Sequence, residues 1–134
     1  MILASLVFAF LAAVLHVYIF TMESINWTKP KVWKTFNLPS QEHAEITKSL
    51  AYNQGFYNLF LAIGAFVGVG LVAFGAGGAA AVAGWTLVFS SCGSMLLAAA
   101  VLALTGKASL RPATIQGVTP LLAVVLGVIA VAAG

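Results

Sequence analysis

The sequence predicts an all-α protein, a bundle of four transmembrane helices, and three observations support this class. The 134 residues are 62% hydrophobic and only 7% charged, whereas soluble domains contain about 45–50% apolar and about 25% charged residues. So short a chain cannot enclose that much apolar surface in its own core, so lipid must cover the rest. Four continuous apolar stretches are long enough to cross a bilayer, and they lack the alternating pattern of a membrane barrel.

The first helix is expected over residues 2–26. No basic residue precedes its apolar run, unlike in a secretory signal peptide, so we expect this helix to be retained as a membrane span. The second helix is expected over 41–74, the third over 79–104 and the fourth over 112–133. Together they predict one integral membrane domain over residues 1–134.

The second helix is expected to begin outside the membrane. Ser40 is placed to act as its N-cap, and Glu42 and Glu45 suit the positive end of a helix. A short extramembrane helical extension therefore precedes the second span. At its other end, the glycine-rich run Gly75–Gly78 predicts a tight turn into the third helix.

The basic residues set the orientation that we expect. All six lie in the connections that follow the first and third spans, and a chain that crosses the membrane four times places those connections on one side. The positive-inside rule makes that side cytoplasmic and puts both termini outside. Six positive charges are too sparse for a nucleic-acid surface. The residues are Lys29, Lys31, Lys34, Lys48, Lys107 and Arg111.

The end of the first helix carries the candidate catalytic residues. His16, Glu23 and Trp27 recur at helical spacing, so they share one face. An ionisable residue within a membrane span indicates a functional site by default. We therefore interpret His16 and Glu23 as an acid/base pair and Trp27 as a ligand-binding residue. The structural alternatives are a satisfied core histidine and a glutamate that reaches the interface.

Further polar residues open the second and fourth helices at the same depth. On the second helix these are Asn53, Gln54, Tyr57 and Asn58, and on the fourth they are Gln116 and Thr119. We predict that all six line one ligand pocket that faces the cytoplasm. The alternative is that the amides and hydroxyls form hydrogen bonds that join the helices.

No metal site or cofactor is predicted. The single cysteine, Cys92, excludes an internal disulfide and a cysteine zinc cluster, and His43 has no partner at a metal-binding spacing. No phosphate loop or dinucleotide fingerprint occurs. The pair Gly64 and Gly68, like Ala80 and Gly84, allows close helix packing. This packing serves either the chain itself or a homo-oligomer, and the sequence leaves both open.

Three stretches of the chain resemble a bacterial membrane family, the domain of unknown function 1304. They are HVYIFTMESINW from His16, LAYNQGFYNLFLAIG from Leu50 and IQGVTPLLAVV from Ile115. The resemblance implies a small four-helix protein of the bacterial plasma (inner) membrane, and it implies no activity. It marks His16, Glu23, Trp27, Asn53, Gln54, Tyr57, Asn58, Gln116 and Pro120 as motif positions.

Three functions fit these observations. The first is a pocket for a small or amphiphilic molecule, either as a binding site or with acid/base isomerase or transferase chemistry. The second is a small membrane transporter coupled to protons through Glu23 or His16. The third is a structural membrane protein whose amides join its helices. The sequence identifies neither a substrate nor a cofactor.

Overall fold

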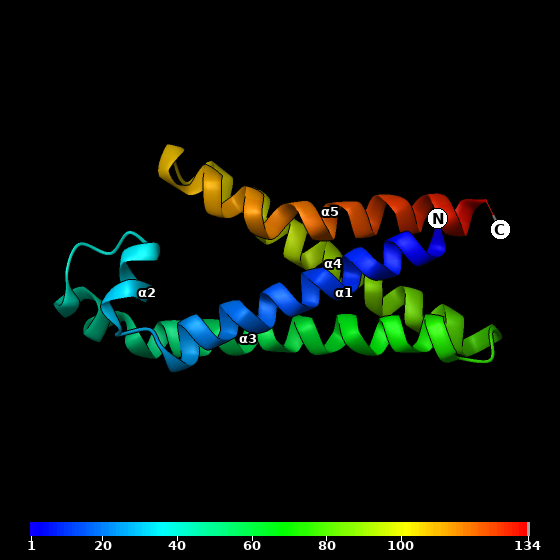
Figure 1. Cartoon of the computed structure of the whole chain (residues 1–134), viewed down its shortest axis with the longest axis horizontal. Coiled ribbons are helices and arrows are strands. Elements are labelled where there is room, and N and C mark those ends of the chain that lie inside the picture. The colour runs from blue at the N-terminus through cyan, green and yellow to red at the C-terminus, as the bar shows by residue number, and fades with distance from the viewer. Residues whose placement is uncertain (134) are drawn as a thin grey trace. The chain divides into compact units, whose positions relative to one another are not determined.

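The computed structural model describes residues 1–133, and over these residues it contains helices and no strand (Figure 1). Four of the helices there are long and apolar enough to span a membrane, which confirms the all-α class and the four candidate spans. In chain order the elements are α1 (Ile2–Phe20), a π-helical turn (Thr21–Ile25), α2 (Pro30–Thr35), α3 (Gln41–Phe74), α4 (Gly78–Leu104), a 3₁₀ turn (Lys107–Ser109) and α5 (Leu110–Ala132).

The bounds differ slightly from those expected. α4 begins at Gly78, one residue earlier than predicted, and α5 begins at Leu110, two residues earlier. Pro112 therefore lies in the first turn of α5, where a proline is tolerated because its missing N–H would have no partner inside the helix.

α3 begins at Gln41, and Ser40 caps it as predicted. The Ser40 hydroxyl accepts a hydrogen bond from the His43 backbone N–H at 3.3 Å. At 1.5 Å per residue the 34 residues of α3 extend about 51 Å, well beyond the roughly 30 Å of bilayer hydrocarbon. Its charged first turns are thus free to lie outside the hydrocarbon.

The chain divides into two compact units. Unit 1 comprises Met1–Leu15 and the chain from Leu61 onward, and unit 2 comprises His16–Phe60. α1 and α3 each contribute to both units. The prediction of one integral membrane domain stays a prediction.

In unit 1, α3 and α4 approach each other almost backbone to backbone. A Cβ on Gly68 would lie 2.8 Å from the Gly84 carbonyl oxygen, and one on Gly84 would lie 2.9 Å from the Val72 backbone nitrogen. A Cβ on Gly64 would lie 2.5 Å from the Ser91 hydroxyl oxygen. The small residues noted in the sequence therefore serve packing within the chain at this crossing.

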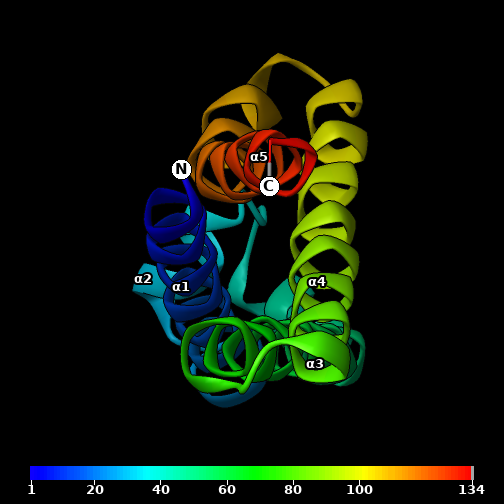
Figure 2. The same ribbon diagram turned by 90° about the vertical axis from the view of Figure 1, so that its right-hand side faces the viewer.

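A second close contact in unit 1 joins α1 to α5 (Figure 2). The buried Ser5 hydroxyl donates a 2.7 Å hydrogen bond to the carbonyl of Ala123. Gly127 lies one turn further along α5, and a Cβ there would meet Ser5, Trp85 and Phe89 within 2.9 Å. Unit 1 is thus held by apolar packing at small residues and by the Ser5 hydrogen bond between α1 and α5.

Candidate functional site

The candidate site is built on the π-helical turn Thr21–Ile25 that ends the first span. The Thr21 carbonyl accepts two hydrogen bonds from Asn26, one from its backbone N–H and one from its side-chain amide, each 3.0 Å long. The backbone bond closes the wider turn, and the side-chain amide caps the same carbonyl. Single π-turns within α-helices often occur at functional sites.

Glu23 lies on this turn, and its carboxylate is held by α3. The Asn58 side-chain amide donates a 2.8 Å hydrogen bond to Glu23 Oε2. The same amide nitrogen donates to the Gln54 backbone carbonyl at 3.2 Å, which fixes the orientation of Asn58. Both side chains are half-buried. The contact joins Glu23 to an amide of α3 that lies 35 residues away in sequence.

Gly55 lets the π-turn come this close to α3. A Cβ at this position would collide with the Ser24 side chain and would lie 3.1 Å from Glu23 Cβ. Ser24 is fixed in turn because its hydroxyl donates a 2.8 Å hydrogen bond to the Tyr52 carbonyl. The glycine of the Asn-Gln-Gly run is therefore a requirement of the Glu23–Asn58 geometry.

Aromatic contacts support both ends of the turn. Before it, Phe20 packs edge-on against Phe56 with ring centroids 5.1 Å apart. After it, the Trp27 ring lies against Phe36 at 4.9 Å, and its indole N–H donates to the Thr47 hydroxyl at 3.1 Å. The connection after α1 is thus tied to α3 on both sides of Glu23.

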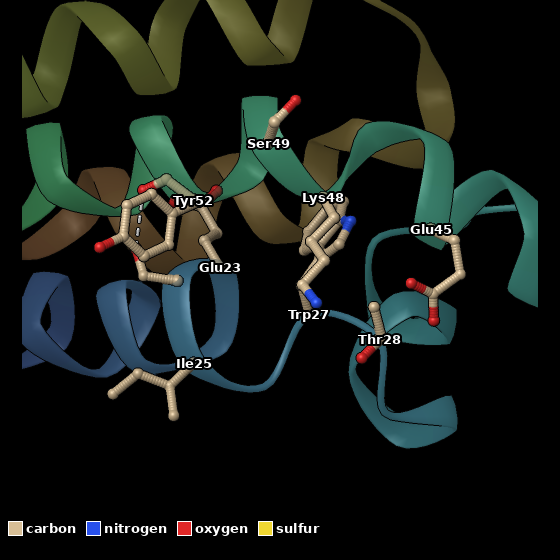
Figure 3. A pocket seen from close by; sticks show the side chains of 9 residues that line it. Glu23, Ile25, Trp27, Thr28, Glu45, Lys48, Ser49 and Tyr52 are labelled. Carbon is tan, nitrogen blue, oxygen red and sulfur yellow. Dashed lines mark hydrogen bonds between the residues drawn. The ribbon is translucent and has the colours of Figure 1, made fainter.

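A pocket of about 530 Å³ lies beside the turn in unit 2 (Figure 3). Residues from the end of the first span and from the start of α3 line it. They include two carboxyl side chains, one lysine and two large aromatic residues. The lining residues are Glu23, Ser24, Ile25, Trp27, Thr28, Glu45, Lys48, Ser49 and Tyr52.

Glu23 and Trp27 are the predicted site residues that line this pocket. His16 lies seven residues before Glu23, about 10 Å away along a helix, and its side chain is only 2% exposed. It is not among the lining residues. Asn58 reaches the site through its hydrogen bond to Glu23. The acid/base pairing of His16 with Glu23 stays a prediction.

The other three predicted site residues of α3 do not line this pocket. The packed face of α3 in unit 2 carries Ala51 and Gly55, with Asn58 half-buried at its edge, whereas Asn53, Gln54 and Tyr57 are exposed. The structure thus places one of the four predicted ligand-binding residues of α3 beside Glu23. The ligand-binding roles of the other three stay predictions.

Gln116 and Thr119 belong to unit 1, on the turn of α5 that precedes Pro120. Pro120 has no N–H to donate to the Gln116 carbonyl, so this turn lacks one helix hydrogen bond. The Thr119 hydroxyl is buried and has no hydrogen-bond partner within residues 1–133. Their predicted roles as ligand-binding residues stay predictions.

The sequence reasoning missed several pocket residues. Glu45, Lys48, Ser49 and Tyr52 follow each other at steps of three, one and three, which puts them on one face of α3. This spacing was readable from the sequence. Gly55 allows the turn that carries Glu23 to approach α3, but a glycine has no side chain that marks it as a site residue in the sequence.

The described part of the chain holds no group of three or more histidine, cysteine, aspartate or glutamate side chains that could bind a metal ion. The fold defines a small helical protein with four helices able to span a membrane. Residues 10–128 match the family described as protein of unknown function (DUF1304), and the chain belongs to this family, as the resemblance of its motifs implied. No curated protein and no solved structure matches the chain.

Proposed function

We propose that this protein binds a small amphiphilic molecule in the pocket of unit 2, at the level where α3 enters the membrane. One observation carries the proposal: the half-buried Glu23 carboxylate, oriented by Asn58, lines a pocket of about 530 Å³. Burying part of a carboxylate at the edge of a membrane span costs desolvation free energy, and such groups are mostly functional.

The lining suits a molecule with a polar head and an apolar tail. Charged and hydroxyl side chains gather around the pocket, and Trp27 and Tyr52 add aromatic surface of the kind found at membrane interfaces. Ile25, 64% exposed, gives the pocket an apolar border. If the bound molecule reacts, Glu23 is the lining group nearest to the membrane-spanning part of α1 and would exchange the proton.

We further propose that the pocket faces the cytoplasm and that both termini lie outside. The six basic residues in the first and third connections support this orientation through the positive-inside rule. The test replaces Cys92 by alanine and introduces single cysteines, Ala76→Cys or Ala108→Cys. In intact cells a membrane-impermeant thiol reagent should label Ala76→Cys and spare Ala108→Cys, and the reverse pattern would overturn the orientation.

Binding is tested with a photoreactive amino acid placed on α3. Benzoylphenylalanine replaces Tyr52, which lines the pocket, or Tyr57, which does not. The two tyrosines are matched because they are 54% and 57% exposed on the same helix. The purified protein is illuminated in vesicles of total polar lipid extract, and the adducts are identified by mass spectrometry.

A selective pocket at position 52 should enrich one class of amphiphile over its share of the extract, while position 57 should reproduce the bulk composition. Equal, bulk-like adducts at both positions would overturn the proposed function.

A further inference from the structure

We propose that the pocket recognises a zwitterionic headgroup in which an ammonium group lies two carbons from a phosphate, as in an ethanolamine phosphate. This inference rests on the proposed function and names the ligand class of the same site. The order of charged side chains along the pocket carries it. That order is Glu45, then Lys48, then Tyr52 and Glu23.

The charges are spaced along one face of α3. Lys48 follows Glu45 by three residues, about 4.5 Å along the helix axis, and Tyr52 follows Lys48 by about 6 Å. Figure 3 shows Glu45 and Thr28 at one end of the pocket, Lys48 with Trp27 in the middle, and Tyr52 with Glu23 at the other end. The pocket therefore has one basic group with a carboxyl group on each side.

This order has a direction relative to the membrane. Glu45 lies in the second turn of α3, on the side away from the apolar part of the helix, and Tyr52 lies toward it. A phospholipid presents its headgroup in the same sequence, with the ammonium outermost, the phosphate next and the ester groups innermost. The ammonium would meet Glu45, the phosphate would meet Lys48, and the ester oxygens would lie beside Ser24 and Tyr52.

The charges of the pocket do not neutralise each other. Within residues 1–133, Lys48 forms no ion pair with Glu23 or Glu45. Glu45 accepts a 3.2 Å hydrogen bond from the Gln41 side chain, which orients its carboxylate without cancelling its charge. A negative charge on Glu45 and a positive charge on Lys48 are thus available to a ligand, one helical turn apart.

A simple anion fits this lining less well. A headgroup with a phosphate and no ammonium would satisfy Lys48 and leave its negative charge next to Glu45, which is repulsive. A headgroup with an ammonium alone would leave Lys48 facing a second positive charge. The zwitterion is the headgroup that pairs with both.

The test measures binding of phosphatidylethanolamine and phosphatidylglycerol to the detergent-purified, delipidated full chain by native mass spectrometry. The two lipids share the phosphate and the acyl chains and differ in the ammonium. Free phosphoethanolamine is added as a competitor, which distinguishes a soluble source of the headgroup from a lipid one. The variants are Glu45→Gln and Lys48→Gln, with Glu42→Gln and Lys31→Gln as controls at exposed residues outside the pocket.

The wild-type chain should bind phosphatidylethanolamine about tenfold more tightly than phosphatidylglycerol, the factor expected of one charge-assisted contact. Glu45→Gln should abolish that preference, Lys48→Gln should weaken both lipids about tenfold, and the two controls should match the wild type. Competition by free phosphoethanolamine supports a soluble ligand of the same chemistry, and its absence supports the lipid.

Equal binding of the two lipids, or a preference unchanged in Glu45→Gln, would overturn the inference. The proposed function fails separately, when position 52 enriches no class of amphiphile at all. Enrichment of a different class at position 52 would leave the proposed function standing and refute the headgroup assignment alone.

Discussion

The two units of this protein use glycine for the same physical purpose and with different results. In unit 1, Gly68 and Gly84 bring two apolar helices into backbone contact, and the atoms nearest to these glycines are backbone atoms and apolar side-chain carbons. In unit 2, Gly55 admits a polar turn, and the contact holds a carboxylate against an amide. Close approach without a side chain therefore stabilises the fold in one region and positions a candidate site in the other.

This difference predicts that substitutions in unit 1 change mainly the stability of the protein, whereas substitutions in unit 2 change both stability and ligand binding. Substitutions that add side-chain volume to the apolar packing of unit 1 should lower its stability, because interiors are close-packed and tolerate added atoms poorly. The polar turn of unit 2 should respond both to volume and to the loss of single hydrogen-bonding groups. Substitutions at matched positions test whether the two regions differ in this way.

The largest effect is expected for Gly68→Val. The new side chain would meet the Gly84 carbonyl oxygen and the Val88 backbone nitrogen at 2.8 Å, and neither backbone atom can move alone. We expect the free energy of unfolding in detergent to fall by about 3 kcal/mol. Gly70→Val is the matched control, since nothing lies within 4 Å of a Cβ there. Equal losses for the two variants would show that α3 and α4 do not touch at Gly68.

Gly55→Ala should have the next largest effect, a loss of about 2 kcal/mol, because its methyl group collides with Ser24. It should also reduce amphiphile crosslinking at position 52, which Gly68→Val should reduce only as far as the protein unfolds. The double variant Gly55→Ala/Ser24→Ala removes the hydroxyl that the methyl group meets and should recover part of both losses. Binding that survives Gly55→Ala at full strength would separate the pocket from the close approach.

The comparison also explains which features were predictable from the sequence. The all-helical class follows from apolar runs of membrane-spanning length, which depend on composition over many residues. The π-turn depends on how one side chain, Asn26, satisfies the Thr21 carbonyl, and no hydrophobic pattern encodes that choice. The sequence therefore predicted that Glu23 ends the first span and did not predict the shape of the turn that holds it.

The faces of α3 show a second limit. The sequence prediction assigns the polar residues of α3 to one pocket because they are polar, although Asn53, Gln54 and Tyr57 lie on the exposed face. The small residues Ala51 and Gly55, four residues apart, were the better guide to the packed face. Two segments of the chain can approach closely only where the side chains between them are small. The spacing of small residues therefore indicates which face of a helix is packed, and a list of polar residues does not.

Asn58→Leu tests the polar side of the comparison. Leucine has the same branched shape and the same number of side-chain heavy atoms as asparagine, and it removes the amide that donates to Glu23 Oε2 at 2.8 Å. Leaving a half-buried carboxylate without this donor should cost about 1.5 kcal/mol of unfolding free energy, measured by chemical denaturation in detergent. Glu23→Gln should cost less, because the new side-chain oxygen still accepts from Asn58. A larger loss for Glu23→Gln than for Asn58→Leu would contradict the assigned hydrogen bond.

The smallest effect is expected in unit 1, at the buried Ser5 hydroxyl. Ser5→Ala removes the 2.7 Å hydrogen bond to the Ala123 carbonyl and adds no volume. Hydrogen bonds between membrane helices contribute about 0.6 kcal/mol on average, so the free energy of unfolding should fall by about that amount. Ser94→Ala, at an exposed position of α4, serves as the control and should leave stability unchanged. A loss for Ser5→Ala as large as that for Asn58→Leu would mean that unit 1 also depends on a polar contact, and the contrast between the two units would fail.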